Sequence, residues 1–345
     1  MDLTDKTYEE IVYKNKIEEL LAHPELLSSW VDMNGVESYD KQDLIKILGA
    51  TKNNKLKVCY THSKKSKKKF GRVYPKNRIS LGALGRKLRG TLTNGTYIDI
   101  DIKNCHPVLI LHFLKKFGFP HKHYAKYVND RQLYLDKIKK VYNCSRDEAK
   151  QFFISAGYGG GYNSWINGLG DHCNHQGSEQ PLWILFQNEA KLVADKFIDT
   201  NPERYNDWKN NRDKTYNHDF GFLAIMLQNI EREILETMTE FFINEGLIRN
   251  NNVILCHDGL MLKIKSIRVD TLKGVEQAIF NKHGFIVSVV DKPLEHLCNE
   301  LKQEKIIAEG EPMDMQYLIN LKTYKLKKEY FERYVCKIIK TGEFI

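Results

Sequence analysis

The chain has 345 residues, 42% of them apolar and 28% charged, and a formal net charge of +9. This length and apolar content exclude a wholly disordered chain and predict a substantial core with two or three subdomains. No apolar run is long enough for a membrane span, and the N-terminus has no apolar signal-peptide core, so we expect no membrane partner and no secretion. The seven cysteines lack CxxC spacing, which favours a reducing cytoplasmic or nuclear compartment of a host cell.

The N-terminal part combines predicted helices with a basic segment. Periodic apolar positions predict helices over residues 1–50. Residues 51–90 then contain 14 Lys or Arg and no acidic residue, so the rest of the chain, with 39 basic and 44 acidic residues, has a balance of −5. A solvated loop or a localisation signal would also explain such a segment. We favour a polyanion-binding strip, because it comes immediately before an acidic strand. Its densest run is Lys64, Lys65, Lys67, Lys68 and Lys69.

An acidic strand followed by an apolar helix is predicted over residues 96–118. Ile98 and Ile100 alternate with Asp99 and Asp101, which is the period of a strand, and a helix follows up to Gly118. Two carboxylates on one face of a strand, near its carboxyl end, can form a cation site. A solvated edge strand would show the same alternation, so this stretch leaves both interpretations open.

A basic helix is predicted to begin near residue 146. Ser145 and Glu148 fit a capping box, and Arg146, Lys150 and Ile154 then share one helix face. Such a face, with an aromatic residue and glycines at its end, suits a triphosphate with a stacked base. A surface helix with a glycine cap is the alternative.

A further carboxylate, Asp258, lies in a predicted hairpin whose turn is His257–Gly259, after an amphipathic helix that carries Gln228. Hard divalent cations need only a few carboxylates when substrate phosphates and water complete their ligands. Two such ions can assist an in-line phosphoryl displacement, so the carboxylates together indicate nucleotidyl transfer. By contrast, His172, Cys173 and His175 lack a fourth ligand and the usual zinc spacing, and the sequence favours no metal there.

These stretches together resemble the core of family-A DNA polymerases and the related single-subunit phage RNA polymerases. The matching positions are, in order, the first-motif Asp101 with His106 five residues later, the helix motif Arg146, Lys150, Tyr158 and Gly159, and the hairpin motif His257 and Asp258. The segment 71–89 looks like the family's Gly-Arg primer–template motif, and Gln228 occupies the place of a template-contacting glutamine. The resemblance covers roughly residues 71–265. The chain departs from the family's DNA polymerases at His106 and Gly259, where they carry Glu, and at Ile154, where they carry an aromatic residue.

The resemblance implies an α/β (α+β) fold of the right-hand polymerase type, with an antiparallel palm sheet, helical fingers and a reduced thumb. Residues 71–106 and 222–295 would form the palm and 107–221 the fingers. Residues 1–70 would stand in for the thumb, and 296–345 would be a helical end or a linker to another domain. The chain as a whole is similar to the polymerase modules of virus-like elements, which are often fused to superfamily-3 helicases.

The implied activity is DNA polymerisation in the replication of a viral or plasmid-like element, on a DNA template-primer with nucleoside triphosphates. Asp101 and Asp258, with Asp99 in support, would hold two Mg²⁺ ions, for which Mn²⁺ could substitute. Lys150 would assist catalysis and bind nucleotide together with the helix-motif residues and His106. Nucleic acid would contact Arg72, Arg86, Arg89, Gln228, His257 and the lysine run. A primase or RNA polymerase on the same core, and an inactive nucleic-acid-binding module of a helicase, are the alternatives.

Overall fold

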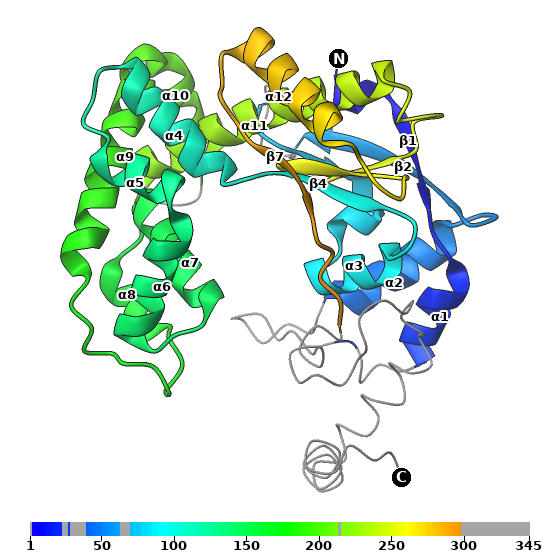
Figure 1. The fold of residues 1–345 in the computed structure, drawn as a ribbon, viewed down its shortest axis with the longest axis horizontal. Coiled ribbons are helices and arrows are strands. Elements are labelled where there is room, and N and C mark those ends of the chain that lie inside the picture. Colours follow the sequence, from blue (N-terminus) through cyan, green and yellow to red (C-terminus); the bar gives the residue numbers. More distant parts are fainter. Residues whose placement is uncertain (1, 23–26, 28–38, 63–69, 213–214, 298–345) are drawn as a thin grey trace, which may run out of the picture.

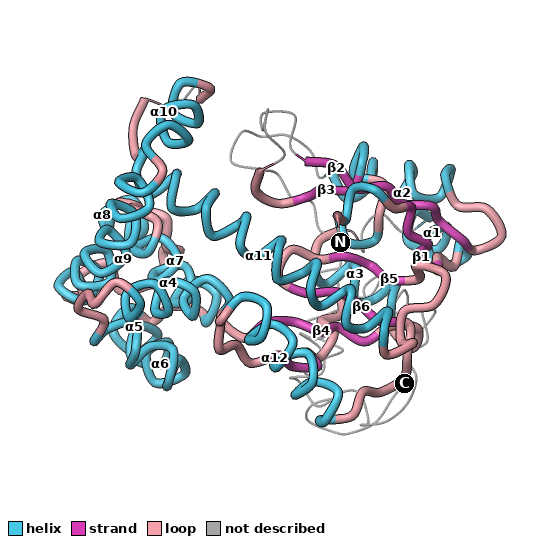
Figure 2. Tube along the Cα trace, turned by 90° about the horizontal axis from the view of Figure 1, so that it is seen from above, coloured by secondary structure: helices cyan, strands magenta, loops and turns pink. Residues whose placement is uncertain are grey.

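The computed structural model describes residues 2–22, 27, 39–62, 70–212 and 215–297. Figure 1 shows a lobe made only of helices beside a lobe that contains the strands. The long helix α11 (His218–Asn244) runs between the two lobes (Figure 2). The predicted class, mixed helix with antiparallel sheet, is confirmed.

A four-stranded sheet lies at the centre of the strand-containing lobe, in the order β5-β6-β4-β7. Each neighbouring pair is antiparallel. Its strands are β4 (Ile98–Ile102), β5 (Val253–Leu255), β6 (Gly259–Leu262) and β7 (Val289–Lys292). Because β4 has a partner on both sides, it is not a solvated edge strand. Helix α11 packs on β6 and helix α12 (Val269–His283) packs on β7, so one face of the sheet is covered.

The helical lobe is built around α9, which contacts α4, α5 and α7 within the lobe and α11 outside it. Its seven helices among the described residues are α4 (Cys105–Lys116), α5 (Lys122–Asn129), α6 (Arg131–Tyr142), α7 (Arg146–Gly157), α8 (Tyr162–Asn167), α9 (Gln180–Thr200) and α10 (Pro202–Asn210). Aromatic rings fill its core, with Trp183 and Phe186 of α9 packed against Phe152 and Phe153 of α7. Aromatic packing therefore fixes the axis of α7 relative to α9.

The N-terminal region differs from the all-helical prediction. Residues 7–11 form a strand, β1 (Thr7–Ile11), which pairs with β2 (Lys55–His62), and β3 (Val73–Pro75) completes a second antiparallel sheet. Tyr8 and Val12 are spaced as in a helix, but Tyr8 and Glu10 are both buried, which is the alternation of a strand. Pairing with β2 supplies the backbone hydrogen bonds that favour a strand over a helix in this segment. The helices and 3-10 turns here are η1 (Leu3–Asp5), α1 (Lys14–Ala22), α2 (Tyr39–Ala50), η3 (Lys76–Arg78), η4 (Leu81–Ala83) and α3 (Arg86–Thr93).

Two predicted features lie outside the described residues. They are the lysine run from Lys64 to Lys69 and the C-terminal segment 298–345. Among the residues that are described, no helix has the length and apolarity needed to cross a bilayer.

One buried carboxylate joins the second sheet to the turn before α3. Glu10 of β1 is fully buried and accepts hydrogen bonds from Ser80 Oγ at 2.6 Å and from the Leu81 N–H at 2.7 Å. Burial raises the pKa of Glu10 to about 7, although the two hydrogen bonds act in the opposite direction. The charged form is therefore disfavoured in the folded state.

The raised pKa of Glu10 predicts that the free energy of unfolding falls as the pH rises. Its folded pKa lies above the unfolded value of about 4.3, so its contribution is fully present below that value and is lost as the pH rises through about 7. We expect Glu10→Gln to exceed the wild type in free energy of unfolding at pH 8 by on the order of 3 kcal/mol, with the difference shrinking toward pH 5. Urea denaturation of both proteins at the two pH values measures this. The same difference at both would contradict the assignment.

Candidate active site

Two carboxylates meet where β4 ends against the β5–β6 turn. Asp101 pairs in register with Gly259, the residue after Asp258. The Ile102 N–H also donates to the Asp258 carbonyl oxygen at 3.1 Å, which fixes the turn against the strand. The predicted strand, the hairpin and the meeting of Asp101 with Asp258 are all present in the structure.

Gly259 makes this close approach of β6 to β4 possible. A Cβ atom at this position would lie 2.1 Å from the Ile100 carbonyl oxygen and 2.9 Å from Asp101 Cα, both of them backbone atoms. Any larger residue would therefore push the turn away from β4. This close backbone contact gives a physical reason for glycine at position 259.

The charges around Asp101 fit a divalent cation. Burial raises the pKa of Asp101, and the Asp258 carboxylate raises it further. Lys292 of β7 partly offsets this, because its Nζ lies 2.8 Å from Asp101 Oδ2. A cation between the two carboxylates would relieve the same repulsion, and oxygen ligands are those that Mg²⁺ prefers. Sequence reasoning missed Lys292, which lies at the end of β7, the last strand among the described residues.

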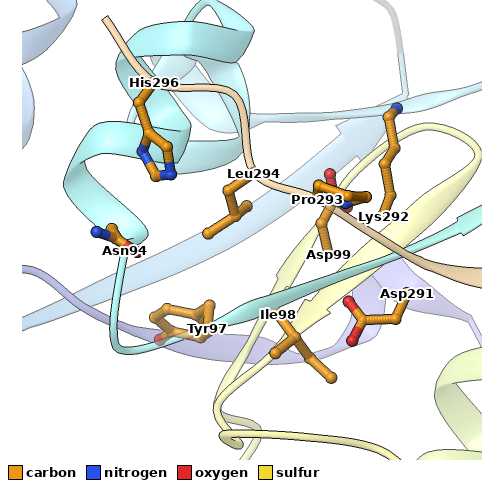
Figure 3. A pocket seen from close by; sticks show the side chains of 9 residues that line it. All are labelled: Asn94, Tyr97, Ile98, Asp99, Asp291, Lys292, Pro293, Leu294 and His296. Carbon is orange, nitrogen blue, oxygen red and sulfur yellow. The ribbon is translucent and has the colours of Figure 1, made fainter. Parts of the chain in front are cut away.

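Asp99 lies beside this pair, on a cavity of about 450 Å³. Figure 3 shows its carboxylate among the cavity residues Lys292 and Pro293, with Ile98 at the start of β4 and Tyr97 just before that strand. Burial raises the pKa of Asp99, while the charges of Arg89 and Lys292 lower it. Its role as a supporting metal ligand stays a prediction.

Helix α7 carries the predicted triphosphate residues. Its capping box is present, since Ser145 Oγ accepts from the Glu148 N–H and the Glu148 side chain accepts from the Ser145 N–H. Arg146 is exposed and Lys150 is half-buried. Burial lowers the pKa of Lys150, and so do the charges of Arg86 and Arg131. The basic face of α7 thus lies within electrostatic reach of α3 on the other lobe.

A chain of hydrogen bonds joins four elements around His106. His106 Nδ1 contacts Tyr158 Oη, and His106 Nε2 lies 2.6 Å from Glu231 Oε2. Arg72 then forms a two-pronged contact with Glu231, with Nη2 and Nε at 2.8 and 3.1 Å from Oε2. The Nε2–H tautomer of His106 satisfies both of its contacts, with Tyr158 donating to Nδ1 and Glu231 accepting from Nε2.

Glu231 is the main residue that sequence reasoning missed. Its side chain is fully buried, and burial alone would raise its pKa, but the hydrogen bond from His106 and the charge of Arg72 hold the pKa below its ordinary value. A signal was present, because Glu231 lies three residues after Gln228 in the otherwise apolar half of α11. A buried charge there requires partners. Arg72, predicted to contact nucleic acid, is one of them.

The other predicted nucleic-acid residues have varied surroundings. Arg86 forms an ion pair with Glu295 at 2.9 Å, and Arg89 donates to the carbonyl oxygens of Gly82 and Leu84, so part of its donor capacity maintains the local fold. His257 is exposed and packs edge-on against Tyr74, with ring centroids 5.5 Å apart.

The remaining two predicted positions are Gln228, on α11, and Gly159, in the turn after α7. Gln228 is half-buried on α11. Gly159 has φ of +70°, and a Cβ there would lie 2.2 Å from the Phe220 ring, so its backbone conformation and packing require glycine.

The carboxylate pair predicts stabilisation by divalent cations. We expect Mg²⁺ to raise the melting temperature of the wild type by a few degrees, because a ligand that binds only the folded state stabilises it. Asp101→Asn should lose this rise, and without metal it should be no less stable than the wild type, since the raised pKa of Asp101 shows that its charged form costs stability. Asp270→Asn, which changes an exposed carboxylate on α12, is the control. An equal rise in all three proteins would contradict the site.

The chain is similar to a curated relative and to solved structures. No family model matches the chain. The protein named "Putative helicase V13" of the Sputnik virophage is 29% identical over 244 residues, which are 70% of this chain and 30% of that protein. The chain therefore spans less than a third of this relative. The POL domain of Pol1 from M. smegmatis, in complex with DNA primer-template and dNTP, aligns with a TM-score of 0.46 and 11% identity, over 72% of this chain and 50% of that one.

Proposed function

We propose that this chain catalyses template-directed nucleotidyl transfer as a DNA polymerase of the family-A type, in the replication of a viral or plasmid-like element. The observation that carries the proposal is the meeting of Asp101 and Asp258 at one end of a buried antiparallel sheet. The mutual repulsion of these carboxylates and the lysine on Asp101 support a cation site there. A module that only bound nucleic acid would gain nothing from carboxylates facing phosphate.

In this mechanism Asp101 and Asp258 would hold two Mg²⁺ ions, with Mn²⁺ as a substitute. Bound there, such ions would supply Lewis-acid chemistry, which lowers the pKa of a primer hydroxyl and neutralises charge on a leaving pyrophosphate. The protein contributes a rigid support: β4 is hydrogen-bonded on both sides, and the Asp258 turn is fixed by the Ile102 N–H. Lys292 would balance the charge of Asp101 before cations bind.

The basic face of α7 would hold the triphosphate. Arg146 is exposed and free to turn toward phosphate, whereas Lys150 is half-buried. The lowered pKa of Lys150, caused first by burial, makes it a better proton donor to the leaving group than an exposed lysine. The predicted strip over residues 51–90 would track the phosphates of the template-primer.

His106 would select the sugar. Its ring is held from two sides, by Tyr158 and by Glu231, so it is not free to rotate away from an incoming nucleotide. A pinned imidazole acts as a steric barrier to a 2′-hydroxyl. We therefore propose that dNTPs are preferred over NTPs and that Glu231 is the positioning residue behind His106.

The virophage relative suggests a partner. Its printed name describes a helicase, and this chain corresponds to less than a third of it. We propose that this chain works together with a helicase of superfamily 3, either as a separate subunit or within one polypeptide. Unwinding would then supply the single-stranded template that polymerisation consumes.

The test of the activity is primer extension by the wild type, Asp101→Ala and Asp258→Ala. Loss of either ligand should remove several kcal/mol of transition-state stabilisation, so we expect a rate reduction on the order of 10³-fold or more with template binding retained. Asp270→Ala controls for the loss of a surface carboxylate. Substantial extension by either folded variant would reject the metal assignment, and no extension by the wild type would reject the activity.

The sugar preference is tested by the ratio of kcat/KM for dNTP over NTP. We expect the wild type to favour dNTP, His106→Ala to lower the ratio by on the order of tenfold or more, and Glu231→Gln to lower it less, because the ring loses one of its two supports. Glu189→Gln is the matched control, a buried carboxylate that instead accepts from the backbone N–H groups of His123 and Tyr124. Wild-type preference for NTP would overturn this and favour a primase.

A further inference from the structure

Three possible metal ligands that are not part of the carboxylate pair come together in the helical lobe. Glu148 lies in the first turn of α7, and His172 and Cys173 lie in the loop 168–179 between α8 and α9. Each offers one ligand atom, and the three atoms all lie within 4.8 Å of one another. No other group of three such side chains comes this close in the part of the chain that the structure describes. In Figure 1 the labels α6, α7 and α8 mark this end of the lobe.

The spacing of the ligand atoms fits a tetrahedral ion. His172 Nε2 and Cys173 Sγ are 3.6 Å apart. Zinc bonds of about 2.3 Å to sulfur and 2.0–2.1 Å to nitrogen, at a tetrahedral angle, separate the two atoms by roughly 3.6 Å. The combination of a thiol, an imidazole and a carboxylate also favours zinc over the hard cations Mg²⁺ and Ca²⁺, which take oxygen ligands.

The backbone around His172 and Cys173 is fixed by hydrogen bonds of its own, while the two ligand side chains contact each other. The Cys173 N–H donates to the Gly170 carbonyl oxygen at 2.9 Å, and the Asn174 N–H donates to the Tyr142 carbonyl oxygen at 2.7 Å. A Cβ on Gly170 would lie 2.8 Å from His172 Nδ1, so glycine there lets the imidazole fold back over the loop. The loop is therefore held against the end of α6 with its ligands already gathered.

Glu148 can cap α7 and bind an ion at the same time. Its Oε2 accepts from the Ser145 N–H at 2.7 Å, but a carboxylate has about four lone-pair positions in total. Two nearby side chains that could also bind a metal form hydrogen bonds with backbone carbonyl oxygens instead. His175 Nε2 lies 3.3 Å from the Gly170 carbonyl oxygen, and the Cys144 thiol donates to the Ile138 carbonyl oxygen at 3.9 Å.

We propose that Glu148, His172 and Cys173 bind one zinc ion, with water in the fourth position on the exposed side of His172. The ion ties the loop 168–179 to the first turn of α7. Because Arg146 and Lys150 lie on that helix, the ion stiffens the N-terminal end of the basic face. These three ligands could not be recognised from the sequence. Neighbouring positions suggested His172 and Cys173 together with His175, whereas Glu148 is distant in the chain.

The test is the metal content of the full chain, produced without a histidine tag in zinc-supplemented medium. We expect about one zinc per chain in the wild type, and its loss in His172→Ala and in Cys173→Ser. His175→Ala and Cys144→Ser are the matched controls and should keep the metal. A chelator should lower the melting temperature of the wild type and of the controls, but not that of the two ligand variants. This readout does not depend on polymerase activity.

Cobalt substitution covers the case in which a ligand variant fails to fold. Cobalt(II) added to the metal-free wild type should give thiolate-to-metal charge-transfer absorbance, and zinc should abolish it. A wild type that contains no zinc, takes up none and gives no such absorbance would overturn the proposal. Loss of zinc from either control would overturn the ligand set.

Discussion

The antiparallel pairing of β4 with β6 brings Asp101 and Asp258, from distant parts of the chain, to one end of a sheet. Gly259 permits this approach, because a side chain there would collide with the backbone of β4. The cost is electrostatic: burial and the neighbouring carboxylate both raise the pKa of Asp101, and Lys292 offsets only part of this. A counter-charge lowers the cost of keeping two such groups together, and the proposed divalent cation would supply more of it than Lys292 does.

A second constraint joins the two lobes. Arg72, next to the second sheet, forms an ion pair with the buried Glu231 of α11, which also holds His106 of α4, and His106 contacts Tyr158 at the end of α7. Removing one partner would leave a buried charge without compensation, which is costly in a protein interior. The ring that faces the proposed nucleotide site is thus part of the scaffold, and its position depends on α11 as much as on α4.

Short sequence patterns correctly predicted the elements that depend on only a few neighbouring residues. The alternation around Asp99, the Ser145–Glu148 capping box and the hairpin at Asp258 are each encoded within a few residues, and all three are present. The N-terminal strand was predicted as a helix, because only pairing with β2 decides between the two periods. Partners that depend on tertiary packing, such as Glu231 and Lys292, could not be assigned from sequence spacing.

We propose that Asp101 and Asp258 form a divalent cation site. Anomalous diffraction from crystals soaked in Mn²⁺ tests it most directly, because the signal locates the ion without reference to activity. We expect a peak between the two carboxylates, at about 2.0–2.2 Å from their oxygens, the range typical of small divalent cations, with Lys292 displaced from Asp101. No peak there, with Lys292 still bonded to Asp101, would contradict it.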